Sequence, residues 1–167
     1  VNKNFRKNDP FKVYSVDSDK KYINLNLKKL KKLKLANYVS LNFSKTYLGT
    51  FNNRICSYYN KIPNVLPDLI YLDAPGQFDV YGSMNGINFR SIERMPISGD
   101  LLLMEYMLLP GCRIIVDGRK TNARFLKNNF QRNWKYSEND KFDFCEFQLN
   151  EKPIGNINKK QIKFSKS

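Results

Sequence analysis

The sequence of 167 residues contains no histidine, and this absence excludes several kinds of catalytic site. A Ser-His-Asp triad, a Cys-His dyad and a His-ligated metal site all need an imidazole. Any general base in this protein must therefore be a carboxylate, a lysine or a tyrosine.

Cysteine and long apolar runs are also scarce. Cys56, Cys112 and Cys145 lie far apart and form no Cys-x-x-Cys pair, which excludes the usual zinc and redox motifs. Such scattered cysteines are typical of reduced, buried thiols, so we expect a cytoplasmic protein. Residues 101–109 form the most apolar stretch, which is too short to span a bilayer and contains Glu105. We therefore expect no membrane segment, and because residues 1–10 are polar we also expect no signal peptide.

Negative charge is in short supply, with 15 Asp and Glu against 29 Lys and Arg. Lysine outnumbers arginine, and asparagine is abundant, which is the profile that an AT-rich genome produces without selection for a polyanion. A nucleic-acid surface favours arginine for bidentate contacts and gathers its basic residues on one face. A nucleic-acid partner is therefore the less favoured interpretation, although residues 19–35 concentrate lysines on one face.

Hydrophobic periodicity predicts alternating strands and helices in one domain over residues 11–167, after the polar tail 1–10. Three runs that end in an acid predict strands at 11–17, 69–73 and 113–117. Residues 38–43 and 142–149 predict two further strands, and 161–164 a last short one. Helices are expected over 19–35, 101–108 and 122–130, with 50–62 helical or irregular. Ser18, Ser98 or Asp100, and Thr121 are the expected helix caps, in that order.

This order predicts an α/β fold, specifically a Rossmann-like doubly wound sheet that is mostly parallel. The last two strands have no helix between them, so we expect the sheet to end in an antiparallel β-hairpin.

Three predicted strands end in an acid, and parallel strands would bring Asp17, Asp73 and Asp117 to one rim of the sheet. Asp17 fits an acid that accepts hydrogen bonds from ribose hydroxyls; alternatively, it turns the chain or caps the next helix. Asp73 could orient a substrate, act as a base or ligate a hard cation, and Asp117 could share the task. Two carboxylates are too few to predict a metal site.

Residues 74–97 form a segment that is too long for an ordinary connection. Its aromatic and basic side chains could shape an acceptor pocket, or the segment could simply cover the sheet. The candidates for such a pocket are Phe78, Tyr81, Phe89, Arg90 and Arg94.

Three runs in this order resemble class I S-adenosylmethionine-dependent methyltransferases: Val-Tyr-Ser-Val-Asp, Pro-Asp-Leu-Ile-Tyr-Leu-Asp, and Leu-Leu-Pro-Gly-Cys-Arg-Ile-Ile-Val-Asp-Gly. The chain is most similar to an uncharacterised bacterial branch close to macrocin-type sugar O-methyltransferases, and residues 114–134 are its most family-like stretch. The resemblance covers about residues 11 to 165. It implies S-adenosylmethionine as cofactor and a small-molecule acceptor, such as a sugar, that is methylated on oxygen.

The resemblance also implies roles for individual residues. Asp17 and Ser18 would bind the cofactor ribose, and Ser44 would lie in the adenine region. Asp73 would lie beside the cofactor near the methyl-transfer centre, and Asp117 on the acceptor side. Asp73 and then Asp117 are the candidate catalytic bases.

The sequence departs from the family in several places. The family's first strand and glycine-rich loop should precede Val13, but the upstream residues contain no glycine, so we expect an N-terminally incomplete fold. Residues 11–17 and 69–73 should then flank a vacant or collapsed strand position. Relatives tend to have glycine in place of Ala74 and an acid in place of Gly76, and Ser44-Lys45 lacks the usual adenine-binding acid.

Two alternative functions remain open. The chain could be a non-catalytic remnant or binding module of the same fold, or a nucleic-acid-binding protein that uses the Lys-rich helix 19–35.

Overall fold

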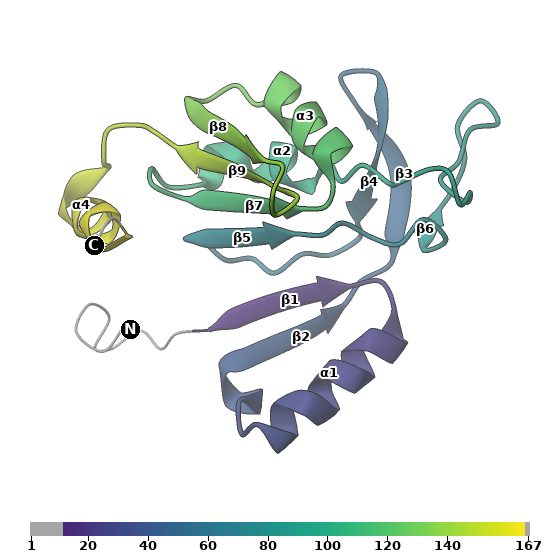
Figure 1. Ribbon diagram of the computed structural model, residues 1–167, viewed down its shortest axis with the longest axis horizontal. Helices are drawn as coiled ribbons and strands as arrows, with labels where there is room; N and C mark the ends of the chain where they lie inside the picture. Colours follow the sequence, from purple (N-terminus) through teal and green to yellow (C-terminus); the bar gives the residue numbers. More distant parts are fainter. Residues whose placement is uncertain (1–11, 166–167) are drawn as a thin grey trace.

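The fold begins with a strand–helix–strand unit in which both strands run in the same direction (Figure 1). The computed structural model describes residues 12–165, so the predicted tail 1–10 lies outside the described residues. Strand β1 (Val13–Asp17) pairs with β2 (Val39–Phe43), and helix α1 (Lys20–Lys32) and the 3-10 turn η1 (Ala36–Tyr38) connect them. The cap prediction was wrong by one residue: the Asp19 side chain, not Ser18, accepts the Lys21 amide at 2.7 Å.

A β-hairpin follows where the sequence predicted helix or irregular structure over 50–62. Strands β3 (Thr46–Phe51) and β4 (Arg54–Tyr59) pair antiparallel, and the short strand β6 (Val80–Tyr81) pairs parallel with β3. Asn52 and Asn53 connect the hairpin with φ values of 47° and 60°. Asparagine tolerates this left-handed backbone, and two such residues form the turn that matches the twist of a hairpin.

The largest sheet has the strand order β5-β7-β9-β8. Strand β5 (Leu69–Leu72) runs parallel to β7 (Arg113–Asp117), whereas β9 (Phe144–Leu149) is antiparallel to both β7 and β8 (Trp134–Asn139). An antiparallel hairpin therefore does close the fold, but its strands are β8 and β9. The prediction of a last strand at 161–164 was wrong.

Residues 161–164 lie within helix α4 (Gly155–Ser165), which two contacts hold against the start of β7. The Asn158 side chain donates to the Pro110 carbonyl at 2.9 Å and accepts the Ile154 amide at 3.0 Å. The Ile162 side chain packs on Gly111, where an added Cβ would lie 2.6 Å from it. A strand prediction from four residues missed these contacts because they depend on side chains far apart in the sequence.

Helices α2 (Asp100–Met104) and α3 (Lys120–Asn129) supply apolar side chains to the core of this sheet, and the 3-10 turn η2 (Glu105–Met107) directly follows α2. Ala123 and Leu126 of α3 are fully buried. Thr121 is not the cap of α3 but lies inside it; Arg119 occupies the cap position without a side-chain hydrogen bond. Much of the buried core comes from the central strands of this sheet: Ile114, Val116, Cys145, Phe147 and Leu149.

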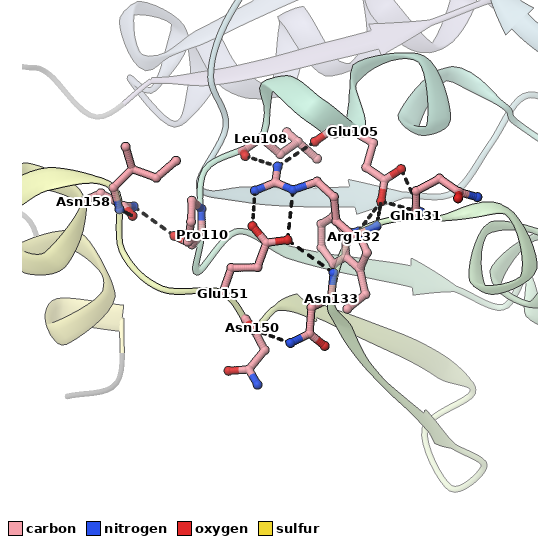
Figure 2. A network of polar contacts seen from close by, with 11 residues as sticks. Glu105, Leu108, Pro110, Gln131, Arg132, Asn133, Asn150, Glu151 and Asn158 are labelled. Carbon is pink, nitrogen blue, oxygen red and sulfur yellow. Dashed lines mark hydrogen bonds and ion pairs between the residues drawn. The ribbon is translucent and has the colours of Figure 1, made fainter.

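A polar network fastens η2 to the chain around β8 and β9 (Figure 2). The buried carboxylate of Glu105 accepts the amides of Gln131 and Arg132 and the Trp134 indole N–H at 2.9 Å. The Arg132 guanidinium donates to the Glu105 and Leu108 carbonyls and pairs with Glu151. Asp117 pairs with Phe144 at the start of β9, whereas Leu149 ends this strand and Glu151 lies just beyond it. The network therefore stabilises the end of the sheet that is remote from the strand-end acids.

The described chain is thus an α/β fold of four helices and mixed sheets. Within residues 12–165, no helix is both long enough and apolar enough to cross a membrane.

Candidate functional site

Three acids lie at, or directly after, the carboxyl ends of the parallel strands. Asp17 is the last residue of β1, Asp117 is the last residue of β7, and Asp73 directly follows β5. Strands β5 and β7 are hydrogen-bonded in parallel, and the arrows of β1 and β2 point the same way in Figure 1. The structure therefore places all three predicted acids at carboxyl ends of strands, where ligands of open α/β sheets bind.

The phenol of Tyr59, at the end of β4, lies within electrostatic range of two of these carboxylates, Asp17 and Asp73. Burial raises the pKa of Tyr59, and the charges of Asp17, Asp100, Asp73 and Asp79 raise it further. Asp17 and Asp73, from strands of two different sheets, therefore lie within electrostatic reach of one hydroxyl. Tyr59 stays protonated at neutral pH and can donate a hydrogen bond at this edge.

Asp17 and Ser18 lie at the corner between β1 and α1, and Asp79, from the segment before β6, interacts with both of them. The Asp17 Oδ1 atom accepts a hydrogen bond from the Asp19 amide at 2.8 Å. Asp17 therefore does turn the chain, which was the alternative to a ribose-binding role. Among residues 12–165, its Oδ2 atom accepts no hydrogen bond. Burial, and then the charges of Asp19 and Asp17, raise the pKa of Asp79, and a hydrogen bond from Ser18 only partly opposes this increase. The Asp17 Oδ2 atom and the Asp79 carboxyl are therefore the two acidic groups at this corner.

Asp73 and Asp117 are held by different partners. Asp73 is 71% exposed, and its Oδ1 atom lies 3.6 Å from Arg119 Nε in the β7–α3 connection. Asp117 accepts the hydroxyl of Tyr71, and this hydrogen bond raises the pKa of Tyr71 to about 12. Asp73 is therefore open to a ligand, whereas Tyr71 occupies one oxygen of Asp117.

A pocket of about 230 Å³ lies at the carboxyl end of β2, beside the predicted adenine position. The hydroxyl of Ser44 accepts the Lys61 amide at 2.9 Å, and its own amide donates to the Asp17 carbonyl. Ser44 is buried and shapes the pocket wall, with its polar groups already engaged. The residues lining the pocket are Phe43, Ser44, Lys45, Asn60 and Lys61.

A second pocket, of about 200 Å³, opens at the carboxyl end of β7 beside the first turn of α3. Arg119 borders it with a side chain that is only 11% exposed, and its buried Nη1 atom has no hydrogen-bond partner among residues 12–165. Lys120 at the same turn pairs with Asp140 at 2.8 Å and with Asp143 at 3.5 Å. The lining of this pocket thus includes two basic side chains and one acidic side chain. Its lining is Met95, Pro96, Ile97, Gly118, Arg119, Lys120, Thr121, Asn122 and Asp143.

Buried hydrogen bonds lock the hairpin end that carries Tyr59 to the main sheet. The Asp100 carboxylate accepts the Tyr59 amide at 3.0 Å and the Ser98 hydroxyl at 2.8 Å. Asn122 in α3 bonds both the amide and the carbonyl of Ser98. Burial raises the pKa of Asp100, while these hydrogen bonds oppose the increase. This junction fixes where the Tyr59 phenol lies.

The long segment 74–97 does not gather its aromatic and basic residues into one pocket. Phe89 is buried, whereas Phe78 is exposed. Arg90 lies over the Tyr81 ring at 5.3 Å, as does Lys45 at 5.6 Å, and Arg94 donates to the Asn88 carbonyl. The last three residues of the segment, Met95–Ile97, line one of the two pockets, but the aromatic and basic candidates do not.

Sequence reasoning missed Tyr59, Asp79 and Arg119. The Asn52-Asn53 pair between two β-type runs signals a hairpin, and that signal would have placed Tyr59 at a strand end. Asp79 and Arg119 carry no local signal, because only the tertiary fold brings them to this edge. Within residues 12–165, no group of three or more Asp, Glu or Cys side chains could hold a metal ion.

Comparisons with known proteins add no relative: no family model, curated protein or solved structure matches this chain.

Proposed function

We propose that this chain is a class I S-adenosylmethionine-dependent methyltransferase domain that acts on a hydroxyl of a small molecule, such as a sugar. The observation that carries the proposal is the convergence of Asp17 and Asp73 on Tyr59 at the carboxyl ends of parallel strands. An acid at the end of β1 and a pocket at the end of the adjacent β2 fit a nucleoside, whose ribose and base would occupy neighbouring strand ends.

The fold that accompanies this function is a Rossmann-like doubly wound sheet that is mostly parallel. Parallel pairing in β1–β2 and β5–β7, followed by the antiparallel hairpin β8–β9, supports it. In such a fold the pairs β1–β2 and β5–β7, which belong to separate sheets in the structure, would be parts of one sheet.

The residues at this edge suit the cofactor. Asp17 Oδ2 and the neighbouring Ser18 would hold the ribose hydroxyls, and the pocket walled by Ser44 would receive the adenine. S-adenosylmethionine supplies an electrophilic methyl group when it is bound. Asp73 lies beside Arg119, is largely exposed, and would accept the proton of the acceptor hydroxyl. Asp117 is the weaker candidate base because it already accepts the Tyr71 hydroxyl.

Calorimetric titration of S-adenosylmethionine into the 167-residue chain tests the proposal. We expect measurable binding that Asp17→Asn weakens by about 10-fold or more, because a charge-assisted hydrogen bond to ribose is lost. Asp140→Asn is the matched control, since Asp140 is an exposed acid that pairs with Lys120. Equal affinity for the wild-type chain and the Asp17→Asn variant would refute the assignment of Asp17.

The same titration addresses the non-catalytic alternative. A non-catalytic remnant or binding module predicts no measurable binding, so tight binding of S-adenosylmethionine by the 167-residue chain would rule it out.

Helix α1 supports a second candidate function, which is nucleic-acid binding. The helix has no acidic residue, and its lysines are exposed along with Lys34 just beyond it. Fluorescence anisotropy with a 20-nucleotide single strand and a 20-base-pair duplex would measure this at 50 and 200 mM salt. Affinity that falls at least about 10-fold over this range, and is lost in a Lys28→Glu, Lys32→Glu variant, is the expected result for this alternative.

A further inference from the structure

The outer side of helix α1 carries a stripe of apolar side chains that residues 12–165 leave uncovered. Tyr22, Leu25 and Leu33 are 58%, 43% and 64% exposed. Their spacing, three and then eight residues, places them along one side of the helix. The less exposed Ile23 and Leu30 lie on a different side, and α1 packs on β1, β2 and η1. Helix α1 therefore has a second apolar side in addition to the one that meets the fold (Figure 1).

Lysines border this apolar stripe and make the outer side of α1 strongly positive. The thirteen residues of the helix include six lysines and no acid. Lys21, Lys28 and Lys32 follow the flank of the stripe at helical spacing, and Lys29 lies within it. Among residues 12–165, no carboxylate forms an ion pair with any of these four lysines. The charge of this surface is therefore complementary to an anionic partner.

Apolar and basic side chains on one helix surface are typical of helices that lie in a membrane interface. Such helices place leucine and aromatic side chains about 5–10 Å deep, at the boundary of headgroups and acyl chains, and lysines among anionic headgroups. A tyrosine ring with its hydroxyl suits this boundary, and long lysine stems reach from it to the headgroups. A nucleic acid would pair with the lysines through its phosphates but would give Leu25 and Leu33 no apolar surroundings. An anionic bilayer fits both components of the surface.

We propose that α1 docks this protein on the surface of a lipid bilayer that contains anionic lipids. Tyr22, Leu25 and Leu33 enter the interface, the neighbouring lysines contact the headgroups, and the opposite side of α1 stays on β1 and β2. Docking of this kind needs no helix that crosses the bilayer. The inference does not depend on the methyltransferase proposal, because its residues line neither pocket and include none of the strand-end acids.

Sedimentation with vesicles tests the proposal directly. The probe is a phosphatidylcholine vesicle with about 30% phosphatidylserine, compared with one of phosphatidylcholine alone, at about 100 mM NaCl. We expect the 167-residue chain to bind the anionic vesicle at least about 10-fold more tightly, because each lysine near the surface adds to the attraction. Equal binding to the two vesicles, or binding to neither, would overturn the proposal.

The double variant Leu25→Gln, Leu33→Gln removes apolar contacts and keeps every lysine. Glutamine is a good helix former, and the 222 nm ellipticity checks that α1 persists. We expect binding to the anionic vesicle to fall at least about 10-fold, because the two leucine side chains no longer leave water. Leu66→Gln, Leu103→Gln is the matched control, since these leucines are 59% and 66% exposed and lie outside α1. If the control bound as weakly as the α1 variant, the proposal would be wrong.

Tyr22→Trp places a fluorescent reporter within the stripe. Its emission, after subtraction of the Trp134 emission of the wild-type chain, should shift to shorter wavelength on the anionic vesicle, because the indole enters less polar surroundings. Bound protein with an unshifted emission would contradict insertion.

The nucleic-acid alternative for α1 predicts a different pattern. Lys28→Glu, Lys32→Glu would then abolish vesicle binding, whereas Leu25→Gln, Leu33→Gln would leave it unchanged. That result would identify a general polyanion surface and would refute docking through the apolar stripe.

Discussion

At the residue scale, Ala74 has a strained backbone directly beside the candidate base Asp73. Its φ is 58°, in the left-handed region that costs a residue with a Cβ roughly 1–2 kcal/mol. Glycine, which has no Cβ, adopts this backbone conformation without strain. Alanine here stores strain at the point where the chain leaves β5.

Replacing Ala74 with glycine should therefore stabilise the protein. We expect the free energy of unfolding in urea to rise by about 0.5–1 kcal/mol, since the relief of strain exceeds the entropy that glycine loses on folding. Ala123→Gly is the control: this buried residue in α3 has helical geometry, and the change should cost about 1 kcal/mol or more. A loss of stability on Ala74→Gly would contradict the argument.

Glu105 is a second residue with a measurable role. Its buried carboxylate accepts three N–H groups, from Gln131, Arg132 and Trp134. In Glu105→Gln one oxygen becomes an NH₂ group that faces these donors, so we expect a loss of about 2–3 kcal/mol in the free energy of unfolding. The exposed Glu93→Gln should change it by less than about 0.5 kcal/mol. Equal effects of the two variants would show that the network contributes nothing.

At the element scale, local pattern was sufficient for some elements and misleading for others. The acid-ended strands, α1 and α3 were predictable from the sequence, because their apolar residues follow patterns that are typical of strands or helices. The hairpin β3–β4 was missed because polar residues and Gly49 interrupt its apolar pattern, and its signal lies in the Asn52-Asn53 turn instead. Helix α4 was mistaken for a strand because its position depends on the contacts of Asn158 and Ile162.

The candidate site was predictable to the same extent. Its three acids follow from strand ends, which are local features. Tyr59 and Arg119 reach the site through the hairpin and the β7–α3 connection, whose positions no local sequence pattern encodes.

The hairpin turn offers a test of its own. Asn53 has a φ of 60°, so Asn53→Gly should stabilise the protein by about 0.5–1 kcal/mol, whereas Asn53→Val should destabilise it by at least that amount. Urea unfolding followed by circular dichroism measures both variants. If the valine variant were as stable as the glycine variant, the left-handed turn would not be the conformation in solution.

At the scale of the whole molecule, stability should be unevenly distributed. The sheet β5-β7-β9-β8 carries the buried cluster, while residues 12–43 have no buried residue. In the 167-residue chain we expect α1 to unfold at a lower urea concentration than the main sheet. Trp134, the single tryptophan, reports on the main sheet by fluorescence, and the 222 nm ellipticity includes α1. Coincident transitions from the two probes would contradict this prediction.

The missing imidazole has a consequence for titration. Without histidine, the protein has no side chain whose ordinary pKa lies between about 5 and 8, so its side-chain charge is nearly constant across that range. An activity or binding profile with an inflection in this window would therefore point to a group whose pKa is perturbed, or to the α-amino group. Asp79 is a half-buried carboxyl whose pKa is raised by burial and by the charges of Asp19 and Asp17.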